Sequence, residues 1–388
     1  MNRIVAYALS ASLHLYVGWR LIPSLADGPS AAAVLAAILL LSYVLMHLGL
    51  QFRRRVDRFA EHLSWATMTA MGLFSSLFVL TLLRDAFLLL VAIAVWVLSV
   101  AGPASFIPVS FPALATGSAL LVPLLALLVT AIGMRNARRT AAVVRVDVPI
   151  TGLPDALHGF TIAQITDIHV GPTIKGPYVD SIVKAVNRLN ADMVAVTGDL
   201  VDGSVAELAR HVWPLARLSS RHGTFFVTGN HEYYSGATAW IAELRRLGLR
   251  VLLNEHVVLQ HGAAALVIAG VTDISAHHFD PTHRSNPQGA IADAPEHALI
   301  RVLLAHQPRS AHEAANAGFH LQLSGHTHGG QFWPWNYFVR LQQPFTAGLH
   351  RLQELWVYVS RGTGYWGPPK RFGAPSEITY LRLVRVTG

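Results

Sequence analysis

The chain has 388 residues, of which 52% are hydrophobic and 13% are charged, and its mean hydropathy is +0.40. This composition is too apolar for a wholly soluble protein, and the length allows two or three domains. Most of the net charge of +8 comes from residues 1–150, which hold 11 Lys and Arg against 5 Asp and Glu, whereas residues 151–388 hold 19 against 17. A basic face for nucleic acid is therefore not expected. The lack of cysteine excludes disulfides and thiolate ligands.

Long uncharged stretches dominate the first 140 residues. No Asp, Glu, Lys or Arg occurs in residues 28–52, 63–83 or 86–134, and a helix needs about 20 apolar residues to cross a bilayer. The last stretch can hold two spans separated by the break from Gly102-Pro103 to Pro108, and residues 4–19 form a further candidate. We expect a multi-pass domain of four to five helices in the inner (plasma) membrane over residues 1–140, a linker over 141–158 and a catalytic domain over 159–388.

The first apolar segment, residues 4–19, has a second interpretation as a cleaved signal peptide. It has one arginine at its start and no convincing small-x-small cleavage site before Asp27. We therefore interpret it as a retained helix.

Two arginine clusters give conflicting information on orientation. They are Arg53, Arg54, Arg55 and Arg58, and Arg135, Arg138 and Arg139. The positive-inside rule places both in the cytoplasm, which requires an even number of crossings between them. Three segments lie between them, however: 63–83, 86–101 and 113–133. Either residues 86–101 do not span fully or one cluster lies outside, and we expect the catalytic domain to be cytoplasmic.

The second half of the chain alternates between strand-like and helix-like stretches. Short apolar runs with β-branched residues, typical of buried strands, are Phe160–Thr166, Met193–Thr197, Thr224–Thr228, Leu266–Val271, Ile300–Ala305, Leu321–Leu323, Leu355–Ser360 and Ile378–Val386. Helix-like stretches are Tyr178–Leu189, Val205–Leu218, Ala237–Leu247 and Arg309–Ala317. The alternation predicts an α/β fold.

Metal-binding side chains occur in five short blocks of this half, nearly all directly after a predicted strand, where α/β sheets place their binding sites. The blocks are Asp167-Ile168-His169, Gly198-Asp199, Gly229-Asn230-His231-Glu232, His306 and Gly325-His326-Thr327-His328. Oxygen and imidazole ligands without a thiolate suit Mn, Fe or Zn. Asp199 has the carboxylate needed to bridge two cations about 3.5–4 Å apart in a phosphoryl displacement. The pattern predicts a two-metal hydrolase.

In this order the blocks resemble the calcineurin-like metallophosphoesterase superfamily, from about Gly159 to the C-terminus. Ser324–Gln331 and Val359–Gly364 are most similar to the branch that includes YkuE-type and YaeI-type enzymes and transmembrane proteins with a metallophosphoesterase domain. The resemblance implies a four-layer α/β/β/α sandwich, with two sheets where the pattern alone allows one. The whole chain would then combine this domain with an N-terminal α-helical membrane domain.

The resemblance also implies a role for each ligand. Asp167, His169 and His328 would hold the first metal ion, Asn230, His306 and His326 the second, and Asp199 would bridge them. A metal-bridging hydroxide is the expected nucleophile, since coordination lowers the pKa of water toward about 7. His231 is expected to stabilise the transition state or protonate the leaving oxygen.

Other polar residues have two interpretations each. Asp202 and Glu232 can orient histidines or serve as solvated or capping groups, and Arg361 and Arg371 can bind a substrate phosphate or form surface salt bridges. Three further histidines are interpreted as surface residues: His277, His278 and His283.

An aromatic segment, Phe332–Phe338, follows the last metal block and is either a packed loop or an interfacial patch, because Trp and Tyr favour the headgroup level. With a membrane domain it favours a lipid-linked phosphoester. The resemblance names UDP-2,3-diacylglucosamine in lipid A biosynthesis as one such substrate and a general phosphodiesterase activity on soluble or cell-envelope substrates as the alternative. Two rival classes are a non-enzymatic membrane sensor, which would have lost a ligand or His231, and a transporter, for which only His14 and His47 lie within spans. The sequence leaves metal identity and oligomeric state open.

Overall fold

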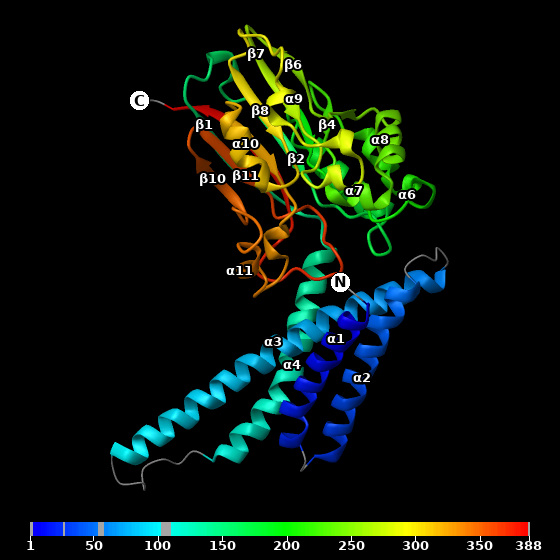
Figure 1. Ribbon diagram of the computed structural model, residues 1–388, viewed down its shortest axis with the longest axis vertical. Helices are drawn as coiled ribbons and strands as arrows, with labels where there is room; N and C mark the ends of the chain where they lie inside the picture. Colours follow the sequence, from blue (N-terminus) through cyan, green and yellow to red (C-terminus); the bar gives the residue numbers. More distant parts are fainter. Residues whose placement is uncertain (1–2, 26–27, 53–57, 102–109, 387–388) are drawn as a thin grey trace. The chain divides into compact units, whose positions relative to one another are not determined.

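A computed structural model describes residues 3–25, 28–52, 58–101 and 110–386 (Figure 1). The chain divides into two compact units, one of Met1–Arg135 with Gly367–Pro369 and one of Asn136–Trp366 with Lys370–Gly388. The first cluster of arginines, at residues 53–55, and the break at residues 102–108 lie outside the described residues. Each unit is described by itself below.

The first unit is helical. Its helices are α1 (Arg3–Leu21), α2 (Pro29–Phe52), α3 (Arg58–Ala101) and α4 (Phe111–Arg138), with a short turn η1 (Pro23–Leu25). Among the described residues, three segments are long and apolar enough to cross a membrane: Pro29–Gly49, Phe59–Val100 and Phe111–Arg138. α1 packs against α2 and α3 without itself being apolar enough. We expected four to five membrane helices. The described residues of this unit contain four helices, and three of these are long and apolar enough to span a membrane.

Residues 63–83 and 86–101, counted as two segments in the sequence, belong to a single helix, α3, of 44 residues. Arg84 and Asp85 do not interrupt it, since both find partners on other elements. Arg84 is 5% exposed and donates hydrogen bonds to Ser24 Oγ at 2.9 Å and Ser118 Oγ at 3.0 Å. Asp85 accepts a hydrogen bond from Arg20 Nε at 2.8 Å. Charges that are paired in this way are tolerated among apolar helices.

His14 of α1 is a packed residue of this helical core. Its ring stacks on Phe74 with centroids 3.6 Å apart, and its two nitrogens lie 2.8 Å from the carbonyl oxygen of Ser10 and 3.3 Å from Ser42 Oγ. The hydrophobic core of this unit takes side chains from all four helices, among them Val17, Leu39, Leu77 and Ala126. The polar atoms of His14 therefore serve helix packing.

The second unit contains two six-stranded sheets. In the first, the strands lie in the order β1 (Ala142–Ile150), β12 (Glu377–Arg385), β2 (Thr161–Ile165), β3 (Met193–Val196), β4 (Thr224–Phe226) and β5 (Arg250–Val251). In the second, the order is β10 (Gly348–Leu352), β11 (Leu355–Val359), β9 (Leu321–Ser324), β8 (Ile300–Leu304), β7 (Ala264–Gly270) and β6 (Glu255–His261). One hydrophobic core takes residues from both sheets, including Ile162 and Phe225 from the first and Ile268 and Leu323 from the second.

Helices cover the outer face of each sheet. α5 (Gly176–Asn187), α6 (Val205–Val212) and α8 (Ala237–Arg246) share a core with the first sheet, and α9 (Pro287–Ala290) and α10 (Ala311–Asn316) share one with the second. α5 buries Val179, Ile182, Val183 and Val186, which is the spacing of one helix face. The predicted four-layer α/β/β/α sandwich, with an apolar helical part before it, is confirmed.

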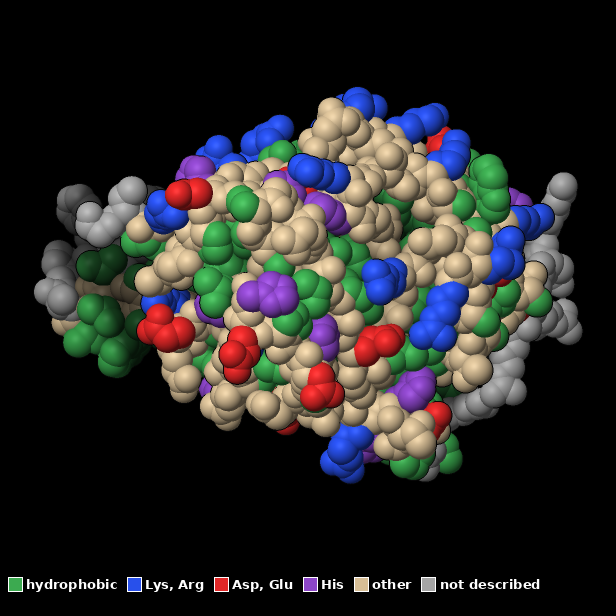
Figure 2. All heavy atoms as spheres, turned by 90° about the horizontal axis from the view of Figure 1, so that it is seen from above, with side chains coloured by type: hydrophobic (Ala, Val, Ile, Leu, Met, Phe, Trp, Pro, Cys, Tyr) green, Lys and Arg blue, Asp and Glu red, His purple; other side chains and the backbone are tan. Residues whose placement is uncertain are grey.

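The remaining helices of this unit are short and lie in loops. They are α7 (Asn230–Ser235), α11 (Asn336–Val339), η3 (Asp155–Leu157), η4 (Trp213–Arg217), η5 (Ala276–His278), η6 (Pro281–His283), η7 (Pro308–Ser310) and η8 (His328–Gly330). The face drawn in Figure 2 carries both acidic and basic side chains, in keeping with the small net charge of residues 151–388.

The segment expected to be a linker, residues 141–158, contains strand β1, so that expectation is wrong. β1 pairs in parallel with β12 over nine residues, from Ala142 with Glu377 to Ile150 with Arg385, and Val148 and Ile150 enter the core between the sheets. The alternation of valine with Arg145 and Asp147 is a local strand signal, but the strand that it pairs with lies at the far end of the chain. Local pattern carries no information on such a pairing.

Candidate metal centre

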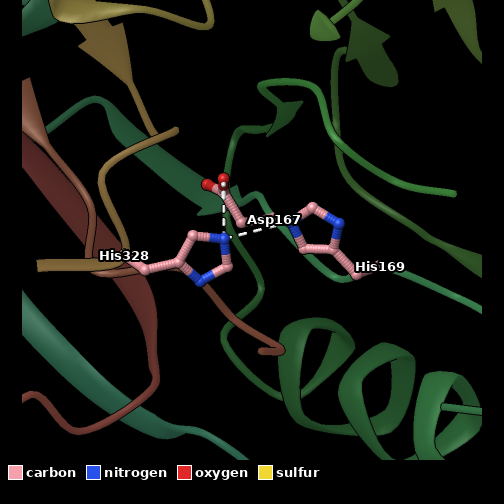
Figure 3. A group of neighbouring side chains, drawn as sticks. All are labelled: Asp167, His169 and His328. Carbon is pink, nitrogen blue, oxygen red and sulfur yellow. Dashed lines mark hydrogen bonds and ion pairs between the residues drawn. The ribbon is translucent and has the colours of Figure 1, made fainter. Parts of the chain in front are cut away.

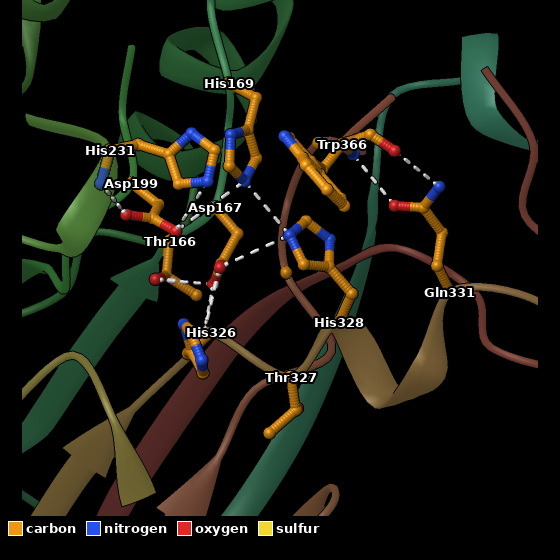
Figure 4. Close-up of polar contacts among 12 residues, drawn as sticks. Thr166, Asp167, His169, Asp199, His231, His326, Thr327, His328, Gln331 and Trp366 are labelled. Atoms are coloured by element: carbon orange, nitrogen blue, oxygen red, sulfur yellow. Dashed lines mark hydrogen bonds and ion pairs between the residues drawn. The ribbon is translucent and has the colours of Figure 1, made fainter. Parts of the chain in front are cut away.

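The expected ligands come from loops at the ends of five strands, three in one sheet and two in the other (Figure 4). Asp167 and His169 follow β2, Asp199 follows β3, and Asn230 begins α7 after β4. In the second sheet, His306 follows β8, whereas His326 and His328 follow β9. The ligand atoms of six of them lie in overlapping groups that are buried or largely buried, and Asn230 is buried as well.

A first group consists of Asp167, His169 and His328, whose ligand atoms lie within 4.8 Å of one another (Figure 3). Nε2 of His169 is 3.0 Å from Nε2 of His328, and the latter is 3.4 Å from Asp167 Oδ1. Nitrogens that each lie about 2.0–2.1 Å from one cation have a similar separation. The group therefore fits one metal ion.

A second group consists of Asp199, His306 and His326, again within 4.8 Å. His306 Nε2 lies 3.0 Å from Asp199 Oδ2 and 3.2 Å from His326 Nδ1. Asn230, at the start of α7, has an amide oxygen that is buried and has no hydrogen-bond partner among the described residues. Buried polar atoms are nearly always paired, so this oxygen fits the fourth ligand of a second cation.

Asp199 connects the two groups. Its Oδ2 is 3.0 Å from His306 Nε2 of the second group and 3.9 Å from His169 Nε2 of the first. Its Oδ1 instead accepts a hydrogen bond from the backbone N–H of His231 at 2.9 Å. One carboxylate oxygen thus faces both groups, which is the geometry that a bridging ligand needs.

The electrostatics of the cluster favour added positive charge. Burial raises the pKa of Asp167, whereas the pKa of Asp199 is well below its usual value because His306 outweighs the effect of burial. Although burial opposes it, the carboxylates of Asp199 and Asp167 raise the pKa of His306 well above its usual value. Burial lowers the pKa of His326 to about 3, so this ring is neutral and has the lone pair that a metal ligand requires.

Asp202 binds two histidines of the centre. Its carboxylate is 3.3 Å from His169 Nδ1 and 2.5 Å from His231 Nδ1. Burial lowers the pKa of His231, but the hydrogen bond to Asp202 and the charge of Asp199 outweigh it and raise the pKa to about 9. His231 Nε2 is 3.9 Å from Asp199 Oδ2. Of the two interpretations of Asp202, the structure supports the one that orients histidines.

For Glu232, the structure supports the second interpretation, that of a capping group. Its buried carboxylate accepts hydrogen bonds from the backbone N–H of Gly229 at 2.6 Å, Asp199 at 3.0 Å and Leu200 at 2.7 Å. The loop after β3 is thereby fixed to the start of α7. Burial has the largest effect on the pKa of Glu232 and raises it to about 7. Glu232 therefore positions the bridging Asp199 through its backbone.

Five of the seven expected ligands have a left-handed backbone. The φ angles are +53° for Asp167, +55° for His169, +51° for Asp199, +69° for His326 and +51° for His328. Only a few per cent of non-glycine residues adopt positive φ, and such residues cluster at functional sites. The strain is compatible with the fold because the surrounding strands and hydrogen bonds hold these loops.

Two glycines of the blocks allow the loops to approach each other. A Cβ atom on Gly229 would lie 2.2 Å from Asp199 Oδ1, and one on Gly325 would lie 2.1 Å from Asp167 Oδ2. Any side chain at either position would displace a ligand. The glycines of these blocks are therefore part of the metal centre.

The structure corrects the expectation for Arg371. This arginine is 1% exposed, and its guanidinium donates to the carbonyl oxygens of His328 at 2.9 Å and Arg361 at 2.7 Å and contacts His328 Nδ1 at 3.0 Å. A side chain so enclosed does not reach substrate; it supports the His328 loop. Arg361 is partly exposed, with its Nη1 2.9 Å from the buried carboxylate of Glu377.

The other histidines singled out in the sequence lie outside both ligand groups. His278 is exposed, His277 is near the carbonyl oxygen of Ile274 at 3.0 Å, and His283 contacts Tyr233 Oη at 2.8 Å. The aromatic segment after the last block is largely on the surface, with Tyr337 65% and Phe338 54% exposed. It is therefore not simply a packed loop.

Comparisons with known proteins agree with this geometry. Residues 160–330 match the family model described as calcineurin-like phosphoesterase. The chain is 33% identical over 224 residues to an uncharacterized metallophosphoesterase of Aquifex aeolicus, over 57% of this chain and 84% of that protein. It is 42% identical over 277 residues to a transmembrane protein with metallophosphoesterase domain of Bos taurus, over 67% of this chain and 62% of that protein.

The chain belongs to the calcineurin-like phosphoesterase family, as the order of its ligand blocks predicted. It spans 62% of the length of the Bos taurus and Danio rerio transmembrane proteins that it matches. A solved structure, a putative 5'-nucleotidase from Staphylococcus aureus, has 14% identity and a TM-score of 0.38 over 59% of this chain and 55% of that one, a likeness too low to add to the assignment.

Proposed function

We propose that the chain is a membrane-bound phosphoester hydrolase that depends on two metal ions. The observation that carries the proposal is that Asp199 Oδ2 lies between two buried groups of ligand atoms. The first ion is assigned to Asp167, His169 and His328, the second to Asn230, His306 and His326, with Asp199 shared. When bound, two such cations activate water and neutralise the charge on a phosphoryl group. Mn, Fe and Zn all suit this donor set.

We assign the proton that the leaving oxygen needs to His231. Asp202 holds its Nδ1, so that Nε2 is directed toward the cluster, 3.9 Å from the bridging carboxylate. Against the effect of burial, Asp202 and Asp199 raise the pKa of His231 and so favour the protonated ring. A protonated ring beside the reacting phosphorus can donate to a leaving alkoxide. The chain retains every expected ligand residue and His231, which supports an enzyme over a sensor that would have lost one of them.

The test is hydrolysis by the purified full chain after removal and stepwise return of metal. We expect no turnover without metal and restored turnover with Mn, Fe or Zn at about two ions per chain. The substrate panel should contain phosphomonoesters, phosphodiesters and nucleotide-sugar lipids. Turnover that persists after complete metal removal would exclude the proposal.

We further propose that the natural phosphoester is linked to a lipid, with UDP-2,3-diacylglucosamine as one candidate. The exposed aromatic segment supports this, since Trp333, Trp335, Tyr337 and Phe338 are 38–65% exposed and such side chains favour the membrane interface. The alternative is a soluble or cell-envelope phosphodiester. A preference of at least tenfold in kcat/KM for lipid-linked over soluble members of the panel distinguishes the two.

For the membrane arrangement, we propose a membrane domain over residues 1–140 and a catalytic domain on the cytoplasmic side of the inner membrane. We take α3 and α4 as the two crossings between Arg58 and Arg135, since the segments 63–83 and 86–101 form one helix; an even number of crossings places both arginine clusters on one side. The chain has no cysteine, so single cysteines at Ser204 and Gln51 can be probed in intact cells with an impermeant thiol reagent. We expect neither to react until the membrane is broken; labelling of Ser204 alone would reverse the orientation.

A further inference from the structure

Two exposed aromatic rings stand beside His231. Trp366 is 54% exposed, and its ring lies 5.8 Å from that of His231 at 77°. Tyr234 is 62% exposed and lies 5.2 Å from the His231 ring at 66°. Phe279, 52% exposed, continues this surface at 5.5 Å from Tyr234. Tryptophan is mostly buried in folded proteins. An exposed tryptophan such as Trp366, in contact with His231, therefore indicates a surface that binds a ligand.

Trp366 is held in place through its backbone. The amide of Gln331 donates from Nε2 to the carbonyl oxygen of Trp366 at 2.8 Å and accepts the N–H of Trp366 on Oε1 at 2.8 Å (Figure 4). Gln331 is 7% exposed and comes three residues after the ligand His328. The same loop that supplies two ligands therefore fixes the position of Trp366.

Gly364, two residues before Trp366, also constrains this segment. A Cβ atom on Gly364 would lie 2.1 Å from the carbonyl oxygen of Ile168, so this part of the chain lies directly against the loop that carries Asp167 and His169. Trp366 is thus positioned relative to both loops of the first ligand group. An aromatic side chain held in this way loses little conformational entropy when it binds a ligand.

We propose that Trp366 and Tyr234 line a subsite that stacks the base of a nucleoside on the leaving-group side of the phosphoester. This rests on the proposed function, because it is His231 as proton donor that places the leaving group beside these rings. Any of the nucleic-acid bases can stack on an exposed indole or phenol face, because every base is flat and aromatic. A flexible acyl chain gains most from an enclosed apolar groove, whereas these rings offer separate, solvent-exposed faces. Gln331 acts as a positioning residue for Trp366.

The experiment measures binding of two probes to the metal-loaded full chain by calorimetry: AMP, and ribose 5-phosphate, which has the same phosphate and sugar without the base. We expect AMP to bind at least about tenfold more tightly. Trp366→Ala should remove that preference and leave the affinity for ribose 5-phosphate unchanged, whereas Trp366→Phe should keep most of it. Gln331→Ala should weaken AMP binding only in part.

The matched control is Trp213→Ala, which removes an equally exposed tryptophan, at 52%, on η4 and should change neither affinity. Melting temperatures of all variants check that each one folds. Equal affinity of the parent chain for both probes would overturn the subsite, as would a loss in Trp366→Ala that is the same for both. Metal-dependent hydrolysis without a base preference would end this inference alone, whereas the absence of any metal-dependent hydrolysis would end the proposed function.

Discussion

The two ligand groups of the centre differ in how their histidines are held. In the first group, charged side chains contact the far nitrogens: Asp202 lies 3.3 Å from His169 Nδ1 and Arg371 3.0 Å from His328 Nδ1. In the second group, a neutral backbone carbonyl, that of Thr197, lies 2.8 Å from His306 Nδ1. The histidines of the first group thus contact charged side chains, one of which, Asp202, also contacts His231. In the second group, His306 contacts the backbone at the end of β3. A change in the charge network should therefore affect catalysis more than metal content.

The largest effect is expected where the two groups meet. Asp199→Ala removes the one carboxylate that faces both, so both metal ions should be lost and hydrolysis should fall below detection. Elemental analysis and turnover measure the two outcomes. Asp155→Ala, which removes a side chain that is 89% exposed, is the control. Full metal content with intact activity would rule out the bridging role.

The next largest effect should be confined to the second group. Asn230→Ala removes the buried amide oxygen that has no partner among the described residues, and we expect bound metal to fall from about two ions to about one. Elemental analysis should show the first site still filled, and Asn316→Ala on the exposed end of α10 should keep both ions. If Asn230→Ala retains two ions at the parent affinity, the assignment of Asn230 as a ligand is wrong.

A variant of His231 should leave both groups filled. His231→Ala removes the proposed proton donor, so the rate should fall about 10²–10⁴-fold with two ions still bound. The loss should shrink for nitrophenyl esters, whose leaving groups need no proton. His278→Ala on the exposed loop serves as the control. An equal loss for good and poor leaving groups contradicts the proton-donor role.

The smallest effect is expected for the charge network. Asp202→Asn keeps the shape of the side chain but removes its charge, and a loss of about 10–100-fold in activity is expected for such a partner of metal-ligating histidines. Asp202 contributes to the raised pKa of His231 of about 9, so in the variant this pKa falls and the protonated form is lost at lower pH. The alkaline limb of the pH–rate profile should therefore move to lower pH for poor leaving groups. If the alkaline limb does not move in Asp202→Asn, then Asp202 does not act through the pKa of His231.

The sequence predicted those parts of the molecule that depend on local pattern. The apolar stretches of the first 140 residues, the strands before the ligand blocks and the order of the blocks all follow from composition and spacing along the chain. Burial of a strand makes it uniformly apolar, and a ligand directly after it is placed at the sheet edge. For that reason Asp167, Asp199 and His306 could be identified without a structure.

The tertiary structure alone decided what depends on contacts between distant segments. β1 became a strand through pairing with β12, and α3 remained one helix because Arg84 finds partners on η1 and α4. Arg371 was interpreted as either a phosphate-binding residue or a partner in a surface salt bridge, but it is buried against the His328 loop. The left-handed backbones of the ligands and the double contact of Asp202 likewise require the assembled loops. Apart from the alternating valines of β1, these features have no local signature, because the energy that stabilises each comes from a partner elsewhere in the chain.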